Sequence, residues 1–329
     1  MKAALYHRYG PPGVVQIASV DKPSPKDGEV LVRIRATTIC TPDWRFRKAD
    51  PFFIRFFNGL WRPKKITILG IELAGEVESV GQAVTKFRPG DQVFGGTGFK
   101  FGAHAEYVCA LADQLERKPS NMSFEAAAAV MFGGVSALYC VRQAKIQAGQ
   151  RVLIYGASGS VGVFAVQLAR HFGAHVTAVC STRNLELVRS LGAHEAVDYT
   201  REDFSAAGRV YDAIIDTVGK SGFSRSLKSL KRGCPYVMIG ASGGTWSMLG
   251  DTLRQRWISI TGAARVVSGM VRPAEGDLAF LKALIEAGQL RTVIDRCYPL
   301  DQIAEAHRHA ETGHKRGHVV VVLEPSSRP

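Results

Sequence analysis

Three glycines in one short stretch of this chain have the spacing of a phosphate-binding turn. Gly156, Gly159 and Gly162 come directly after the apolar residues 152–155 and before apolar residues spaced as on one helix face. A strand, a glycine turn and a helix start place free backbone N–H groups where they can bind an anion. The stretch therefore predicts a dinucleotide site, with a plain structural turn as the alternative. The expected contacts are Gly156, Ser158, Gly159, Ser160, Val161 and Gly162.

The residues after the next expected strand indicate which dinucleotide is bound. A second apolar run, residues 176–179, follows the glycine turn at the distance typical of this unit. NAD sites usually carry Asp or Glu after that strand, bonded to the ribose 2′-hydroxyl. Residues 180–183 are instead Cys, Ser, Thr and Arg, so Ser181 and Arg183 are suited to a 2′-phosphate. We therefore predict NADPH as the cofactor, with an ordinary polar loop as the alternative.

The order of the expected elements predicts two domains in these 329 residues. Short strands separated by Pro and Gly turns dominate residues 1–121, which indicates a mostly β domain. From Ser123 onward helices and strands alternate, which is typical of an α/β Rossmann domain with a doubly wound parallel sheet. The strands expected in this second part are residues 152–155, 176–179, 196–199, 211–216, 236–240 and 258–261.

Composition narrows the class of protein. Hydrophobic residues make up 46% and charged residues 22%, as in ordinary soluble enzymes, and no apolar run is long enough to span a membrane. The net charge of +13 suits an anionic ligand, but the basic residues are scattered, so we expect no dedicated nucleic-acid site. Six widely spaced cysteines predict free thiols in a reducing, cytoplasmic compartment.

Residues 51–61 are unusually aromatic. Phe52, Phe53, Phe56 and Phe57 have the spacing of one helix face. Three interpretations stay open: core packing or a dimer patch, a lid over a bulky apolar substrate, and a helix lying on a membrane surface. The basic residues that would flank such a helix are Arg55, Arg62, Lys64 and Lys65.

Several further motifs make the chain resemble a known family along almost its whole length. It resembles the medium-chain dehydrogenase/reductases, on their zinc-independent quinone-oxidoreductase and enoyl-reductase side. The motifs include Gly-Ile-Glu-Leu-Ala-Gly at 70–75, Phe-Arg-Pro-Gly-Asp-Gln-Val-Phe at 87–94 and Asp-Thr-Val-Gly at 216–219. Further matching stretches are 9–13, 28–32, 105–107, 159–162, 191–199, 293–296 and 313–317.

The resemblance implies an architecture and further cofactor contacts. It implies a GroES-like domain at residues 1–121 and 266–329, a Rossmann domain at 122–265, and a homodimer. Ser136 matches a family Thr near the nicotinamide, and Tyr199 matches a position near the adenosine phosphate. Strand ends that would line the cofactor supply Val218, Ile239 and Gly240.

The same resemblance argues against a metal. Zinc-dependent members hold catalytic zinc on Cys, His and Cys, and catalytic zinc normally needs three protein ligands. Here Cys40 matches the first position, but Ile71 and Gly133 stand at the other two, so we predict no zinc. Cys40, Asp43 and Trp44 are the candidates for the reacting wall of the site, although Asp43 could equally serve only to order its loop. The expected substrate contacts are Phe53, Phe57 and Phe132.

Without zinc, the chemistry best suited to this chain is hydride transfer to an activated double bond. In a quinone or an enone, charge develops on an oxygen that hydrogen-bond donors can hold. We therefore predict a zinc-independent, NADPH-dependent oxidoreductase acting on a small apolar or aromatic carbonyl compound. The alternatives are a dedicated biosynthetic enoyl or imine reductase and a non-catalytic NADPH-binding regulatory protein. The proton donor and the actual substrate are left open.

Overall fold

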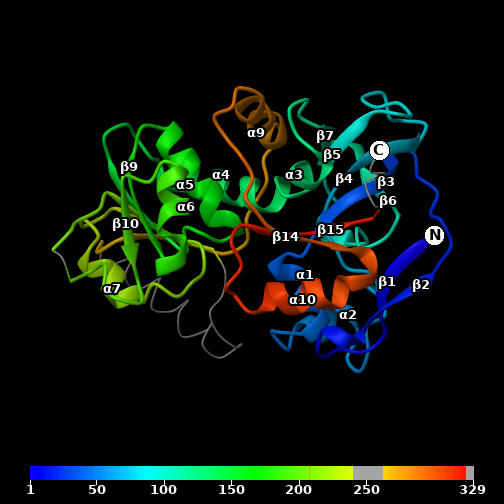
Figure 1. The fold of residues 1–329 in the computed structure, drawn as a ribbon, viewed down its shortest axis with the longest axis horizontal. Coiled ribbons are helices and arrows are strands. Elements are labelled where there is room, and N and C mark those ends of the chain that lie inside the picture. The colour runs from blue at the N-terminus through cyan, green and yellow to red at the C-terminus, as the bar shows by residue number, and fades with distance from the viewer. Residues whose placement is uncertain (207, 240–261, 324–329) are drawn as a thin grey trace. The chain divides into compact units, whose positions relative to one another are not determined.

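The computed structural model describes residues 1–206, 208–239 and 262–323, and the chain divides into two compact units. The first unit comprises Met1–Phe132, Leu278–Ala287 and Thr292–Pro329. The second comprises Gly133–Asp277 and Gly288–Arg291. Figure 1 labels the helices and strands of both units.

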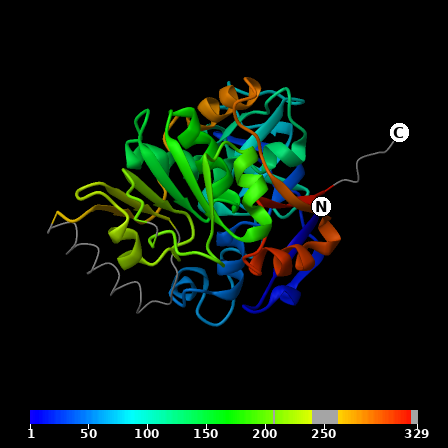
Figure 2. The ribbon, with the colours of Figure 1, turned by 60° about the vertical axis from the view of Figure 1, so that its left-hand side comes forward.

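A parallel sheet of six described strands forms the second unit, as predicted for a doubly wound domain. The strand order is β10-β9-β8-β11-β12-β13, and its green strands lie side by side in Figure 2. The strands are β8 (Arg151–Tyr155), β9 (His175–Cys180), β10 (Glu195–Asp198), β11 (Ala213–Asp216), β12 (Pro235–Met238) and β13 (Arg265–Ser268). The helices are α4 (Met131–Ala144), α5 (Ser160–His171), α6 (Leu185–Ser190) and α7 (Phe223–Lys228).

Strand β8 lies where the strand order of this sheet reverses. It pairs with β9 on one side and with β11 on the other. Val152, Leu153 and Ile154 are fully buried because both faces of a parallel strand are covered. In open α/β sheets, ligands bind at the carboxyl ends of the strands beside such a reversal. The glycine turn after β8 is therefore in the position expected of a binding site.

The first unit is mostly β. Its larger sheet has the order β14-β15-β3-β4-β5-β7, with β6 paired to β3, and β1 and β2 form a separate pair. Its strands are β1 (Lys2–Tyr6), β2 (Val15–Ser19), β3 (Glu29–Thr38), β4 (Glu72–Val80), β5 (Gln92–Gly96), β6 (Tyr107–Leu111), β7 (Leu115–Arg117), β14 (Ile294–Pro299) and β15 (His318–Val322). Its helices are α1 (Thr41–Lys48), α2 (Ile54–Asn58), α3 (Phe124–Ala128), α9 (Asp277–Glu286) and α10 (Ile303–Glu311).

The end of the parallel sheet differs from the sequence-based expectation. The strand predicted at residues 258–261 lies outside the described residues, and the sixth described strand is β13. The predicted domain limit between residues 265 and 266 falls inside this strand, which pairs with β12 as far as Ser268. The sheet extends past the limit because strand pairing depends on a free backbone edge, which composition does not mark.

No helix in the described ranges is both long enough and apolar enough to cross a membrane.

Candidate functional site

The glycine turn between β8 and α5 has the geometry of a dinucleotide loop. Gly156 has a φ of +76°, and a Cβ there would overlap the side chains of Thr217 and Val218. A Cβ on Gly162 would overlap the carbonyl oxygen of Gly156. These two glycines are required for the tight turn and for the close packing of the helix against the loop, respectively.

Gly159 has a different environment, which fits a phosphate. Its φ of −82° is open to any residue, and a Cβ there would meet only the Gly156 carbonyl oxygen, at 3.5 Å. Gly159 is the N-cap of the twelve-residue helix α5, and no side chain caps that end. The space before the helix is thus open to a ligand, and the helix dipole favours an anion there. Ser158, Ser160 and Val161 belong to the same turn, and Ser158 is buried.

The loop after β9 is tied to this turn by a buried asparagine. Asn184 Nδ2 donates to Ser158 Oγ at 2.9 Å and to Ser181 Oγ at 3.3 Å. Asn184 is buried, whereas Arg183 beside it is exposed. The structure therefore brings Ser181 and the glycine turn together, through a residue that the sequence analysis did not single out. A polar residue three positions after Ser181 was the available signal.

A carboxylate lies closer to this loop than the sequence suggests. Asp198 ends β10 and pairs in register with Cys180. The Thr182 hydroxyl donates to Asp198 Oδ2, and this hydrogen bond holds the pKa of Asp198 below its ordinary value. Arg201 Nε lies 3.6 Å from the same oxygen. An ionised Asp198 therefore lies beside the loop, with the Thr182 hydroxyl and the Arg201 guanidinium as its partners.

A cavity of about 370 Å³ lies beside Tyr199, directly after β10. Tyr199 is exposed, and its ring centroid lies 6.3 Å from that of Tyr155 at the end of β8. Arg201 and Arg225 supply positive charge to the lining, and Glu202 and Asp203 supply negative charge. Arg225 lies 3.6 Å from Asp203, so an adenosine phosphate, the ligand expected at Tyr199, would meet aromatic rings, Arg201 and this ion pair.

The turn after β11 is organised by a buried carboxylate. Asp216 Oδ1 accepts the N–H groups of Val218 at 3.0 Å and Gly219 at 2.7 Å. Thr217 Oγ1 donates to the Tyr155 carbonyl oxygen at 2.9 Å, which ties the turn to the glycine loop. Val218 is thereby held partly exposed next to Gly156.

Two further expected contacts come from neighbouring segments. Ile239 follows β12, is buried, and donates its N–H to the Asp216 carbonyl oxygen. Gly240 lies outside the described residues. Ser136 is buried in α4.

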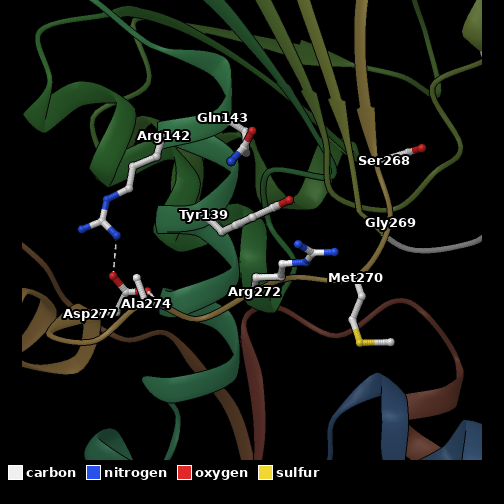
Figure 3. Close-up of a pocket in the computed structure, with 9 residues that line it drawn as sticks. All are labelled: Tyr139, Arg142, Gln143, Ser268, Gly269, Met270, Arg272, Ala274 and Asp277. Carbon is white, nitrogen blue, oxygen red and sulfur yellow. Dashed lines mark hydrogen bonds and ion pairs between the residues drawn. The ribbon is translucent and has the colours of Figure 1, made fainter.

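A second cavity, of about 520 Å³, lies at the carboxyl end of β13 (Figure 3). Helix α4 contributes Tyr139, Arg142 and Gln143, and the other side is formed by residues 268–277. In Figure 3 the Tyr139 ring projects from α4 toward the segment that carries Arg272, and Arg142 forms an ion pair with Asp277. Tyr139 thus places a proton-carrying hydroxyl on the wall of this cavity, beside the outermost described strand of the sheet.

In the first unit, Cys40 is part of a buried hydrogen-bonded cluster. Its Sγ donates to Glu72 Oε2 at 2.8 Å, and the Thr38 hydroxyl donates to the same oxygen. Burial, together with the nearby Glu72 and Asp43, raises the pKa of the Cys40 thiol well above its ordinary value. The thiol is therefore neutral. This agrees with the view of Cys40 as a small pocket residue.

Glu72 was missed by the sequence analysis, although it stands in the quoted Gly-Ile-Glu motif. It is fully buried, and its Oε1 accepts the N–H of Phe132 in the first turn of α4 at 2.6 Å. Burial raises the pKa of Glu72 to about 6. A carboxyl group between the apolar residues Ile71 and Leu73 was the available signal.

Both carboxylate oxygens of Asp43 accept hydrogen bonds from backbone N–H groups. Oδ2 accepts the N–H of Cys40 at 2.7 Å, and Oδ1 accepts the N–H of Gly70 at 2.8 Å. This arrangement caps α1 and fixes the loop before β4. It matches the loop-ordering role left open for Asp43, and a contact with substrate stays a prediction. Trp44 is half-buried, with Arg45 and Lys48 close to its ring.

Lys315 is a further group that the sequence analysis did not select. Its Nζ donates to the Gly317 carbonyl oxygen at 2.5 Å. Burial lowers the pKa of Lys315, and the nearby Cys40 and Glu72 act in the opposite direction. The structure therefore places a cation near the Cys40 and Glu72 pair, from a segment far away in the sequence.

The aromatic segment does not pack as a core. Phe52, Phe53, Phe56 and Phe57 are all exposed, while Ile54 and Asn58 form the buried side of α2. Core packing of these rings, which the first interpretation joined with a dimer patch, is therefore wrong. Helix α2 has only five residues, so side chains expected on one helix face instead point outward from a short turn. Phe132 is half-buried against the cluster that contains Ile39 and Cys40.

The residues present do not fit a catalytic zinc ion. Ile71 and Gly133 cannot ligate, and the Cys40 thiol is protonated and bonded to Glu72. Among the described residues no group of three His, Cys, Asp or Glu side chains could hold a metal ion.

Comparison with known proteins decides the family. Residues 26–120 match the alcohol dehydrogenase GroES-like domain, and residues 191–321 match the domain described as zinc-binding dehydrogenase. A chloroplastic quinone oxidoreductase of Triphysaria versicolor is 32% identical over 98% of both chains. The chain belongs to the medium-chain dehydrogenase/reductases. Within that superfamily it falls in the quinone-oxidoreductase-like branch, and the predicted GroES-like and Rossmann fold class is confirmed.

Solved structures agree with this assignment. The quinone oxidoreductase of Coxiella burnetii has a TM-score of 0.88 and 30% identity, covering 98% of this chain and 99% of that one. The Escherichia coli quinone oxidoreductase, solved with NADPH, has a TM-score of 0.83 and 25% identity, covering 98% and 100%. The chain is therefore an oxidoreductase with a nicotinamide cofactor.

Proposed function

We propose that this protein is a zinc-independent reductase that uses NADPH to reduce an activated double bond in a quinone, an enone or an enoyl-type compound. The observation that carries the proposal is the open cradle at Gly159, at the uncapped start of α5, joined through Asn184 to Ser181. The relatives support it, since several are named quinone or alkenal oxidoreductases and one structure contains NADPH.

The choice of NADPH rests on the loop after β9. Ser181 and Arg183 are suited to a 2′-phosphate, and Tyr199 with Arg201 borders a cavity of adenosine size. Asp198 lies beside this loop, where it accepts a hydrogen bond from Thr182 and forms an ion pair with Arg201. An acid compensated in this way repels a phosphate less than the free acid of an NAD site.

The bound cofactor would supply hydride, and the residues of the chain would position the cofactor and the substrate. The glycine turn fixes the pyrophosphate, and the turn at Val218 borders the cofactor path. Tyr139 is a candidate for returning a proton to the reduced substrate, because it lines the cavity at the end of β13. The neutral Cys40 and the carboxyl group of Glu72 form a hydrogen-bonded pair within the first unit. Phe53, Phe57 and Phe132 remain the predicted contacts for an apolar substrate.

The proposal is tested by following NADPH consumption with a panel of quinones, enones and enoyl thioesters. Turnover with quinones or enones, slower with NADH, is expected. Tight NADPH binding without turnover on any acceptor would favour the regulatory alternative, and turnover of one enoyl or imine compound alone would favour a dedicated biosynthetic reductase. The homodimer stays a prediction, for sedimentation analysis. The cytoplasmic location also stays a prediction, because several relatives are named as chloroplastic or mitochondrial.

A further inference from the structure

The largest concentration of exposed apolar side chains in the first unit lies on residues 52–61, here called the aromatic loop. Phe56 is 75% exposed and Trp61 is 86% exposed. A scattered exposed apolar residue needs no explanation, but a contiguous group of large ones usually marks a binding surface. The exposed members are Phe52, Phe53, Phe56, Phe57, Leu60 and Trp61.

The aromatic loop is held in this outward arrangement by a buried asparagine. Asn58 Nδ2 donates to the Tyr6 hydroxyl at 2.9 Å and to the Ile66 carbonyl oxygen at 3.1 Å. Its Oδ1 accepts the N–H of Ile66 at 2.7 Å. Asn58 therefore satisfies backbone groups that would otherwise draw the loop into another shape, and the rings are displayed by a fixed support.

Gly59 completes this support. Its φ is +114°, and a Cβ there would overlap the carbonyl oxygen of Arg62. The Tyr9 hydroxyl donates to the Gly59 carbonyl oxygen at 2.8 Å. The chain thus reverses tightly at Gly59, which presents Leu60 and Trp61 beside the rings of α2.

The charged residues between the exposed Asp50 and the buried Glu72 are all basic. Arg62, Lys64 and Lys65 are exposed and form no ion pair with any described residue. No Asp or Glu occurs between Asp50 and Glu72, and Glu72 is fully buried. The surface therefore combines large apolar groups with uncompensated positive charge.

We propose that the aromatic loop docks the protein on the surface of an anionic lipid bilayer. Phe56 and Trp61 would enter the boundary between headgroups and acyl chains, where amphipathic aromatic rings are favoured. Arg62, Lys64 and Lys65 would lie at the level of the negatively charged headgroups. The contact is peripheral, since five residues of helix cannot span a bilayer.

The charges favour a bilayer over a second copy of this chain. A symmetric contact through the aromatic loop would bring the same three cations of two copies together, without an acid of the loop to pair with them. Like charges placed opposite each other at an interface oppose association. An anionic lipid surface instead complements both features of the loop.

The test is flotation of the intact protein with two kinds of vesicle, phosphatidylcholine alone and phosphatidylcholine mixed with phosphatidylglycerol. The native protein is expected to float with the mixed vesicles and to stay largely unbound with the neutral ones. Lys64→Glu/Lys65→Glu should lower binding at least about tenfold, from the loss of roughly fivefold per cation. Phe56→Ser/Trp61→Ser should also lower it, because the inserted rings are removed.

Matched controls separate docking from general charge and from unfolding. Lys228→Glu/Arg232→Glu makes the same change of charge on exposed residues of the second unit, and Phe99→Ser removes another exposed aromatic ring of the first unit. Both should float like the native protein. Equal flotation of the native protein with both kinds of vesicle would overturn the proposal, and so would an equal loss in the controls. A dimer that dissociates in Phe56→Ser/Trp61→Ser, without a change in flotation, would assign the loop to self-association instead.

Discussion

Cys40 and Glu72 share a hydrogen bond of 2.8 Å in the interior of the first unit. The two residues lie at the end of β3 and at the start of β4. In zinc-dependent members of the family, the position of Cys40 carries a metal ligand. Here the thiol donates to a carboxyl oxygen, and Ile71 and Gly133 stand at the other two ligand positions. The residues present therefore do not supply the three protein ligands that catalytic zinc normally needs.

Removal of metal should therefore leave the protein unaffected. The purified protein is expected to hold no stoichiometric zinc, and its activity should withstand a strong chelator, because Cys40 alone remains of the ligand set. Elemental analysis and NADPH oxidation before and after chelation measure this. One tightly held zinc ion per chain, lost together with activity, would contradict it.

The carboxyl group of Glu72 should make stability depend on pH. Its pKa of about 6 lies above the ordinary value of 4.5, so the unfolded chain releases this proton before the folded protein does as the pH rises. The contribution of Glu72 to stability is therefore largest below about pH 4.5, falls through about pH 6, and is lower by about 2 kcal/mol above that. Glu72→Gln removes this loss. Its free energy of unfolding relative to the native protein should rise by up to about 2 kcal/mol between about pH 4 and pH 8.

Urea unfolding at both pH values measures the effect. Glu275→Gln, which neutralises an exposed carboxyl group, is the control and should show little change. A difference between Glu72→Gln and the native protein that is the same at both pH values would mean that the pKa of Glu72 is the same in the folded and the unfolded protein, which contradicts the prediction.

Substitutions at two glycines of the turn should distinguish a glycine needed for stability from a glycine needed for cofactor binding. Gly162→Ala places a Cβ against the Gly156 carbonyl oxygen and should destabilise the protein by about 1–3 kcal/mol. Gly159→Ala meets no such obstacle at a φ of −82°, so its melting temperature should stay close to native. The added methyl group instead fills the cradle, and the Kd for NADPH should rise. Melting curves and NADPH titrations on both variants make the comparison. Unchanged NADPH binding in Gly159→Ala would argue against a phosphate at this turn.

Arg183 should discriminate between the two nicotinamide cofactors. Arg183→Ala is expected to weaken NADPH binding by about 1–3 kcal/mol and to change NADH binding little, as for loss of one charge-assisted hydrogen bond. Titration of both cofactors, by fluorescence or calorimetry, gives the two Kd values. Arg232→Ala is the control. It removes an exposed arginine that precedes the amino end of β12, whereas the cofactor is expected at the carboxyl ends of the strands. Equal affinities of the native protein for both cofactors would exclude this assignment.

Phe53 and Phe57 should affect the choice of substrate if they contact it. Each is about half exposed, so truncation to Ala should change the melting temperature little. A lost aromatic contact of ~1–3 kcal/mol should lower kcat/KM for a large enone more than for a small one. Phe99→Ala is the control. The same large-to-small ratio in the native protein and in both variants would remove these residues from the substrate site.

The sequence alone determined the local features of this protein. The apolar run before Gly156, the spacing of the three glycines and the alternation of strands and helices are set by backbone sterics and short-range periodicity, which are readable along the chain. They predicted the parallel sheet, the dinucleotide turn and the mostly β first unit. Only the tertiary structure decided which distant side chains meet. Strand register pairs Asp198 with Cys180 and so brings Asp198 within hydrogen-bond distance of Thr182. Packing brings Glu72 to Cys40, and it brings Asn184 to Ser158.

The aromatic loop is a second case in which the tertiary structure, and not the spacing in the sequence, decided the outcome. Its spacing of phenylalanines fits a buried helix face, yet the rings are exposed because Asn58 and Gly59 fix a short turn. Whether an apolar side chain is buried depends on what the rest of the fold places against it, and that is a property of three-dimensional packing rather than of sequence spacing.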